Sequence, residues 1–260
     1  MDVLETFSLK NKVVLVTGGA GLYGRQIVAA CAEAGAETHI ASRNLDSLEK
    51  LADEHQKKGY SVIAHRLDQA DEGSVLTLKD TLSERIGRLD VLVNNAVARP
   101  MKGYDDDVSA FEESMRINAT GLFLITRTMG DFMAQTEGGS IINIGSIMGM
   151  IGPDPTNYTG TSMSAWYPDY FFHKGGMINF TRFVASYYGD KGIRCNCVSP
   201  GGLYQQTMPE AFITNYTSRT LLGRLAHDTD LKGIIVFLAS DASVYVTGVN
   251  IPVDGGYTAK

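Results

Sequence analysis

The sequence predicts an α/β fold, namely a single doubly wound Rossmann-type domain with a parallel sheet of about seven strands. Short apolar runs alternate with segments of helical periodicity along the whole chain of 260 residues. The first run, residues 13–16, is apolar at every position, which is typical of a parallel strand covered on both faces. Because no repeat, low-complexity segment or linker interrupts residues 1–260, we expect one domain.

The first strand leads into a glycine-rich turn at residues 17–24, then a helix that ends near Gly35, then a second strand at 38–41. Gly19, Gly21 and Gly24 have the G-x-G-x-x-G spacing in this strand–turn–helix context. Such glycines let the backbone approach a pyrophosphate at a helix N-terminus. The turn therefore predicts a dinucleotide site, the alternative being glycines that only reverse the chain.

The alternation of strands and helices continues to the end of the chain. Apolar runs predict strands at 62–64, 90–96, 140–146, 193–198 and 248–253. Helical periodicity predicts helices at about 71–86, 107–134, 170–188 and 229–239, with an irregular, partly helical segment at 202–228. Since ligands bind beyond the carboxyl ends of parallel strands, the residues that end four strands are expected on one rim: Thr17, Asn94, Ser146 and Pro200.

Tyr170 and Lys174 are four residues apart on a predicted helix, so both side chains lie on one face. A nearby ammonium favours the phenolate and lowers the pKa of the phenol. Tyr170 is therefore a candidate to exchange a proton with a substrate oxygen. Taken alone, the spacing is more often that of an ordinary surface pair.

The motifs described above, taken together and in order, resemble those of the short-chain dehydrogenase/reductases over essentially the whole chain. The resemblance rests on the turn 17–24, Asp68, the run 94–96, Asn118, Ser146, Tyr170, Lys174, Pro200 with Gly201 and Thr207, and the run 254–256. It implies a nicotinamide cofactor and hydride transfer between that cofactor and a carbonyl or alcohol carbon.

The resemblance implies four catalytic residues. Tyr170 is the general acid in reduction and the base in oxidation, and Lys174 lowers its pKa and holds the cofactor ribose. Ser146 donates to the substrate oxygen. Asn118 holds a water that links Lys174 to solvent. Without the resemblance, Ser146 reads as a helix cap, Asn118 as a solvated amide and Asp68 as a turn former.

The resemblance also implies a cofactor site, in which Asp68 meets the adenine, Asn94 and Ala96 the ribose side, and Thr207 the phosphate or carboxamide. The expected cofactor contacts are Thr17, Gly18, Gly19, Gly21, Leu22, Tyr23, Gly24, Ser42, Arg43, Asn44, Leu67, Asp68, Asn94, Asn95, Ala96, Tyr170, Lys174, Pro200, Gly201 and Thr207.

The end of the second strand favours NADP(H) over NAD(H). NAD enzymes place an acid there for the ribose 2′-hydroxyl, whereas this chain has Ser42 followed by Arg43. Arg43 is suited to a 2′-phosphate. If Arg43 only stacks on the adenine, NAD(H) remains possible.

The chain departs from the usual family pattern at three places. Leu22 stands where the short branch has glycine, and Val97 replaces another glycine. Ser146 and Tyr170 are about twice as far apart as is usual, so 147–169 carries an insertion. Tyr158 falls at the usual distance but has Ser162, not a cation, four residues later.

The insertion is either surface decoration or, as we expect, a wall of the substrate pocket that 202–228 caps. The expected substrate contacts are Ser146, Met148, Tyr158, Trp166 and Tyr170. Hydroxyls and amides in the insertion, together with Arg99, Lys102, Asn215, Arg219 and Arg224, favour a polyol, sugar or sugar acid, as in gluconate 5-dehydrogenase-like members. The alternatives are a 3-oxoacyl or steroid-type ketone reductase and, in another class, a non-catalytic dinucleotide-binding sensor, which typically lacks the Tyr or Lys.

Composition narrows the choice of partners. The net charge of −6 and pI of about 5.4 argue against nucleic acid and anionic membranes, and no apolar run approaches the ~18 residues of a membrane span. Without a visible signal peptide or disulfide framework, we expect a cytoplasmic protein that needs no metal. A helix face with Met177, Phe180, Val184 and Tyr188 suggests a homotetramer or dimer, although core packing explains it equally well.

Overall fold

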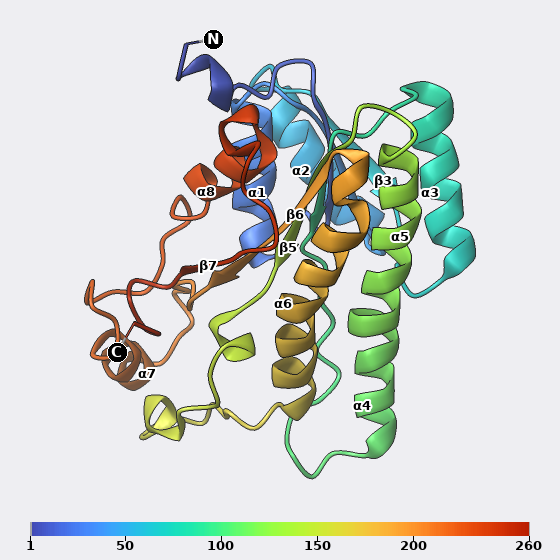
Figure 1. Ribbon diagram of the computed structural model, residues 1–260. Coiled ribbons are helices and arrows are strands. Elements are labelled where there is room, and N and C mark those ends of the chain that lie inside the picture. The colour runs from blue at the N-terminus through green and yellow to red at the C-terminus, as the bar shows by residue number, and fades with distance from the viewer. Residues whose placement is uncertain (1, 260) are drawn as a thin grey trace.

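A seven-stranded sheet, parallel throughout, runs through the middle of the computed structural model, which describes residues 2–259 (Figure 1). Its strands lie in the order β3-β2-β1-β4-β5-β6-β7. They are β1 (Val13–Thr17), β2 (Glu37–Ser42), β3 (Val62–Arg66), β4 (Val91–Asn94), β5 (Gly139–Ile144), β6 (Ile193–Pro200) and β7 (Asn250–Val253). The prediction of one doubly wound domain with about seven parallel strands is confirmed.

Helices cover both faces of the sheet (Figure 1). One layer contains α1 (Leu22–Glu33), α2 (Leu45–Gln56) and α8 (Lys232–Ala239), and the other contains α3 (Glu72–Arg85), α5 (Gly121–Met133) and α6 (Pro168–Tyr188). Val14 and Val16 of β1 pack into the first layer, whereas Leu15 packs into the second. Because successive side chains of a strand point to opposite faces, a strand between two helix layers is apolar at every position.

Shorter elements complete the chain. The helix α4 (Val108–Met115) continues through the π-helix η2 (Arg116–Thr120) into α5, which together fill the range predicted as one long helix. Within the segment predicted to be irregular lies α7 (Glu210–Thr217). Single helical turns are η1 (Glu5–Phe7), η3 (Ile147–Gly149), η4 (Pro155–Tyr158), η5 (Gly189–Lys191) and η6 (Asp241–Ser243).

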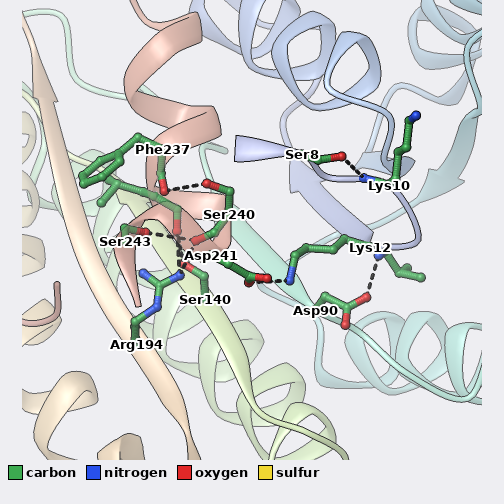
Figure 2. A network of polar contacts seen from close by, with 12 residues as sticks. Ser8, Lys10, Lys12, Asp90, Ser140, Arg194, Phe237, Ser240, Asp241 and Ser243 are labelled. Carbon is green, nitrogen blue, oxygen red and sulfur yellow. Dashed lines mark hydrogen bonds and ion pairs between the residues drawn. The ribbon is translucent and has the colours of Figure 1, made fainter. Parts of the chain in front are cut away.

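The amino ends and the carboxyl ends of the strands have different roles. At the amino ends of the strands, a polar network joins the sheet to the end of α8 (Figure 2): Arg194 donates to the carbonyls of Leu238 and Ser240, and Ser140 donates to Leu238. Nearby, Lys12 pairs with Asp241 at 2.9 Å. These bonds hold β5, β6 and the end of α8 together. At the carboxyl ends of the strands, the strand order reverses between β1 and β4. Doubly wound sheets bind ligands at such a point.

The helix face suggested as a contact between subunits is mostly core. Met177, Val184 and Tyr188 are 2–4% exposed, so core packing explains them. A different row of aromatic rings is exposed instead: Phe183 is 61% and Tyr187 is 55% exposed, and their ring centroids are 6.1 Å apart. No helix within residues 2–259 is both long and apolar enough to span a membrane.

Candidate active site and cofactor cleft

Ser146, Tyr170 and Lys174 come together at the carboxyl edge of the sheet. Tyr170 lies in the first turn of α6, and the Lys174 ammonium lies one turn on, 5.8 Å from the Tyr170 ring centroid. Lys174 is 3% exposed, and its Nζ donates to the carbonyl of Ile144 at the end of β5. A Cβ on Gly149 would lie 2.6 Å from the Lys174 backbone, so only glycine lets the loop after β5 press this closely on the helix.

The surroundings of Tyr170 make it a suitable acid–base group. Burial raises the pKa of Tyr170, but the charges of Lys174 and Arg99, with hydrogen bonds from Ser146 and Arg99, outweigh burial and bring that pKa below its ordinary value. The Arg99 guanidinium carbon lies 4.5 Å from the Tyr170 ring centroid. Two cations thus flank one phenol, an arrangement that favours proton exchange near neutral pH.

Ser146 has two partners. Its Oγ accepts a hydrogen bond from the Met148 amide at 3.1 Å, which caps η3, and it hydrogen-bonds Tyr170. The two interpretations of Ser146, helix cap and substrate donor, are therefore compatible, because the cap uses the oxygen as an acceptor and leaves its O–H as a donor.

Asn118 lies in the π-helix η2, where the changed backbone register is a feature frequent at functional sites. The side chain is 3% exposed, which excludes a solvated amide. Its Oδ1 accepts from the Ala98 amide at 2.9 Å, and its Nδ2 donates to the Ala98 carbonyl at 2.8 Å and to Ser114 Oγ at 3.0 Å. Ser114 in turn donates to Asp169 at 2.6 Å. This chain of bonds ties the loop that carries Arg99 to the helix that carries Tyr170.

His173 packs edge-on against Tyr170, with ring centroids 5.2 Å apart. Burial lowers the pKa of His173 to about 3, with the charges of Lys174 and Arg99 acting in the same direction. The imidazole is therefore neutral at physiological pH. Neither ring nitrogen has a hydrogen-bond partner among residues 2–259, so no described contact gives His173 a part in proton transfer.

The glycine turn has the shape that a dinucleotide needs. Gly18 has φ of +68°, and a Cβ there would lie 2.8 Å from Ala96 Cα. A Cβ on Gly24 would lie 2.3 Å from the Gly18 carbonyl oxygen. Gly21 precedes α1 and offers no side chain to cap it, so backbone N–H groups of its first turn are available to an anion. Leu22, the departure from the family pattern, is 61% exposed and fits without crowding.

Several expected cofactor residues are used inside the protein. Thr17 Oγ1 accepts from the amides of Asn95 and Ala96, both at 3.1 Å, and Asn95 Nδ2 donates to the Gly18 carbonyl. Asn94 is 3% exposed and donates to Thr126 and Asn143, so its side chain is committed to the interior. These residues shape the cleft rather than offering their side chains to it.

The remaining expected contacts lie along the rim. Arg43 is exposed at the end of β2, Ser42 donates to the Asn44 carbonyl, and Asn44 caps α2 through Ser47. Asp68 accepts from the Ala70 amide, which makes it a turn former as well, while Leu67 is buried. Thr207 is exposed beyond Pro200 and Gly201, at the start of the 202–228 segment. Arg66 was missed by sequence reasoning, yet it is exposed and pairs in register with Ser42.

The insertion packs against the 202–228 segment. The Tyr158 ring lies 5.4 Å from that of Phe212 in α7, in an apolar cluster that Met148 joins, whereas Trp166 is 52% exposed. Asn215 donates to the Thr159 carbonyl at 3.0 Å, and Arg219 pairs with Asp154 at 3.0 Å.

Three of the polar side chains taken to favour a hydroxylated substrate have partners within the protein. Asn215 and Arg219 join the insertion to the 202–228 segment, and Arg224 pairs with Asp230. Arg99, by contrast, lies against the Tyr170 ring. Ser114 and Asp169 gave no signal in the sequence, because their contact spans 55 positions.

Comparison with known proteins gives matches over nearly the entire chain. A family model described as Enoyl-(Acyl carrier protein) reductase matches residues 21–258. The NADP-dependent mannitol dehydrogenase of Hypocrea jecorina is 32% identical, covering 99% of this chain and 96% of that protein. A 3-oxoacyl-acyl-carrier-protein reductase of Thermotoga maritima is also 32% identical, covering 95% and 98%.

Among solved structures, a gluconate 5-dehydrogenase from Burkholderia cenocepacia J2315 in complex with NADP and tartrate matches with a TM-score of 0.90, at 28% identity and with 100% of both chains covered. The seven-stranded parallel fold agrees with these matches. The chain is therefore an enzyme of the short-chain dehydrogenase/reductase family, a dinucleotide-dependent oxidoreductase that interconverts carbonyl and alcohol groups.

Proposed function

We propose that this enzyme oxidises and reduces a polyol, a sugar or, above all, a sugar acid, and that it prefers NADP(H). The observation that carries the substrate proposal is Arg99. Its guanidinium lies against the Tyr170 ring, yet the residue is exposed, so it can meet a substrate whose reacting oxygen is at Tyr170. A guanidinium binds a carboxylate through two parallel hydrogen bonds, and it also serves hydroxyl oxygens as a donor.

We assign the proton chemistry to Tyr170, Ser146 and Lys174. In alcohol oxidation, Tyr170 Oη accepts the hydroxyl proton while the hydroxyl-bearing carbon loses a hydride, and in carbonyl reduction Tyr170 returns the proton to oxygen. The bound nicotinamide cofactor accepts or supplies that hydride. Ser146 Oγ donates to the substrate oxygen as charge develops there. Lys174 has three N–H donors, one of which bonds Ile144, and the others are free to hold a ribose hydroxyl.

The proposed preference for NADP(H) rests on the end of β2. The chain has Ser42, not a carboxylate, at this position. The exposed Arg43 follows Ser42 in the chain, and the exposed Arg66 lies beside Ser42 on the neighbouring strand β3. Charge-assisted bonds to a 2′-phosphate contribute ~1.5–3 kcal/mol each, so NADPH should bind about 10–150-fold more tightly than NADH.

Titration of NADPH and NADH into the free protein tests the preference. Replacing Ser42→Asp together with Arg43→Leu should reverse it, because a carboxylate repels the 2′-phosphate and can accept from a 2′-hydroxyl. Arg25→Leu is the matched control, since Arg25 is an exposed arginine on α1 near Glu54. Equal dissociation constants for the two cofactors, or tighter NADH, would contradict the proposal.

A substrate panel tests the reaction. Polyols, aldoses, ketoses, keto-sugar acids and a 3-oxoacyl thioester should be compared by nicotinamide absorbance with both cofactors. We expect the highest kcat/KM for hydroxylated substrates and, among them, for those with a carboxylate. Arg99→Gln should lower kcat/KM for the acids about 10-fold or more beyond its effect on uncharged polyols. Preference for the thioester would instead favour a 3-oxoacyl reductase, and no turnover of any substrate would favour a dinucleotide sensor.

We also propose that the chain forms a homo-oligomer through the exposed aromatic row of Phe183 and Tyr187, which are 61% and 55% exposed. Contiguous exposed apolar side chains of this size mark protein–protein contacts. Light scattering after size-exclusion chromatography should give a dimer or tetramer, and Phe183→Glu with Tyr187→Glu should give a monomer. A wild-type monomer at micromolar concentration would refute the contact.

A further inference from the structure

One peptide group at the end of β6 is held from both sides by tyrosine hydroxyls. The Tyr23 hydroxyl donates to the carbonyl oxygen of Gly201 at 2.7 Å. The amide of Gly202 donates to the Tyr216 hydroxyl at 2.6 Å. The Gly201 carbonyl and the Gly202 amide belong to the same peptide bond, so two phenols fix both polar atoms of a single plane.

The two tyrosines come from parts of the chain that have different tasks. Tyr23 is the second residue of α1, in the turn that receives the pyrophosphate, whereas Tyr216 lies in α7 of the segment that caps the substrate. The clamped peptide follows Pro200, the last residue of β6. The clamp therefore connects the glycine turn, the end of a central strand and the capping helix.

Both glycines of this peptide are closely packed and also line a cavity. A Cβ on Gly201 would lie 3.0 Å from the Tyr216 hydroxyl, and a Cβ on Gly202 would lie 2.8 Å from Leu225 Cδ2. The cavity is lined by Gly201, Gly202 and Tyr216, among other residues. Because glycine has no side chain of its own to anchor the backbone beside the cavity, the two hydrogen bonds hold the orientation of the peptide.

Both phenols remain neutral hydrogen-bonding groups. Burial raises the pKa of Tyr23 far above its ordinary value, with the neighbouring Tyr216, Tyr170 and Asp230 adding to the rise. Burial likewise raises the pKa of Tyr216, although the bond from the Gly202 amide lowers it in part. Tyr23 therefore keeps the proton that it donates to Gly201 at neutral pH.

The position of the clamp bears on the nicotinamide half of the cofactor. A dinucleotide lies across the point where strand order reverses, with one nucleotide on each side. The 2′-phosphate site proposed at Ser42 and Arg43 places the adenine half beside β2 and β3. The nicotinamide half then lies on the side of β4, β5 and β6, where Tyr170 acts and where Gly201 ends the sheet.

We propose that Tyr23 and Tyr216 are positioning residues that fix the Gly201–Gly202 peptide as the wall of the nicotinamide site. This inference rests on the cofactor orientation in the proposed function. Loss of one clamp hydroxyl removes a single hydrogen bond from the wall. Affinity for the complete dinucleotide should then fall about 3–10-fold, whereas affinity for the adenine half should stay the same.

The test compares two ligands that differ in the nicotinamide alone. NADP⁺ and 2′-phospho-ADP-ribose should be titrated calorimetrically into the wild type, Tyr23→Phe and Tyr216→Phe. Tyr188→Phe is the matched control, because the Tyr188 hydroxyl also makes a short bond, to Asp131 of α5 at 2.8 Å, but from the C-terminal end of α6. Thermal melting of all four proteins records any general loss of stability.

Each result decides the question. Weaker binding of NADP⁺ with unchanged binding of 2′-phospho-ADP-ribose, in Tyr23→Phe and Tyr216→Phe but not in Tyr188→Phe, supports the clamp. Equal weakening of both ligands, or no change in either, overturns it and leaves the hydroxyls purely structural. If one variant does not fold, the other gives the answer, since each removes one side of the same peptide. A wild type that binds neither ligand would refute the proposed function itself.

Discussion

Replacing Arg99 with glutamine should raise the pKa of Tyr170 and move the pH dependence of turnover. Arg99 is the second of two cations that lower this pKa, after Lys174. Unlike Lys174 it is exposed, so its removal leaves no buried cavity or unpaired buried group. The variant therefore isolates an electrostatic effect from a structural one.

The size of the shift follows from the geometry. Taking the ring centroid as the site of the phenolate charge, a unit charge 4.5 Å away contributes ~0.9 kcal/mol at the dielectric constant of water and ~3.7 kcal/mol at an effective value of ~20. Because Arg99 is exposed, solvent screening favours the lower part of this range. We therefore expect a rise of about one pKa unit, which corresponds to ~1.4 kcal/mol.

The limb of the pH profile that moves depends on the direction of the reaction, and in both directions it moves to higher pH. Oxidation requires Tyr170 as the phenolate, so a higher pKa moves the acidic limb of kcat/KM about one unit to higher pH. Reduction requires the phenol, so the alkaline limb of kcat/KM for reduction moves to higher pH as well. The assay is kcat/KM against pH for an uncharged polyol and its ketose, because a charged substrate would add the loss of its own contact with Arg99.

Lys102→Gln is the matched control. Lys102 is an exposed cation three residues away, and its ammonium bonds the Arg99 carbonyl rather than Tyr170. Its pH profile should match the wild type. An unmoved limb in Arg99→Gln, or a limb moved to lower pH, would refute the view that Arg99 stabilises the phenolate.

Three further outcomes are expected. Tyr170→Phe should lower kcat by at least about 100-fold while NADPH binding persists, whereas Tyr158→Phe should keep the chemical step, and steady-state rates with calorimetric titration check both. Shortening 147–169 should raise KM or broaden specificity in the substrate panel without weakening cofactor binding, and unchanged constants would mean surface decoration. Because the folded-state pKa values of His65, about 4, and His173, about 3, lie below the ordinary 6.5, the unfolded chain binds more protons below that pH. The free energy of unfolding, measured with urea, should therefore be highest above about pH 6.5 and fall progressively toward pH 4, less steeply in His173→Phe.

The sequence was sufficient for the fold and for the local parts of the site. Strands such as β1 and β4 are short apolar runs, and Gly18 and Gly24 of the turn are required by close contacts with Ala96 and with the Gly18 carbonyl. The four-residue spacing of Tyr170 and Lys174 is likewise a property of one helix. These features depend mainly on residues that are close together in the sequence, so the sequence pattern predicts them.

The contacts that the sequence did not reveal are long-range and polar. The bonds from Ala98 through Asn118 and Ser114 to Asp169 join segments whose order in the sequence says nothing about their distance in space. Asn94 shows another limit of the sequence: its motif position suggested a contact on the ribose side, but not that its amide donates to Thr126 and Asn143. A polar side chain near a rim cannot be assigned to a ligand until its internal partners are known.

The glycine turn shows why a departure from a family pattern is a poor guide to its consequence. Leu22 is the conspicuous change, but it is exposed, and the helix N-terminus remains open beside it. The adjacent Tyr23 was expected only as a cofactor contact, and nothing in the sequence gave its hydroxyl a partner in the protein. In the structure its hydroxyl reaches a carbonyl 178 positions away and joins the turn to the end of β6. If the clamp governs nicotinamide binding, the residue that matters most in this turn is Tyr23, which bonds the end of β6, and not Leu22, which stands in place of a glycine.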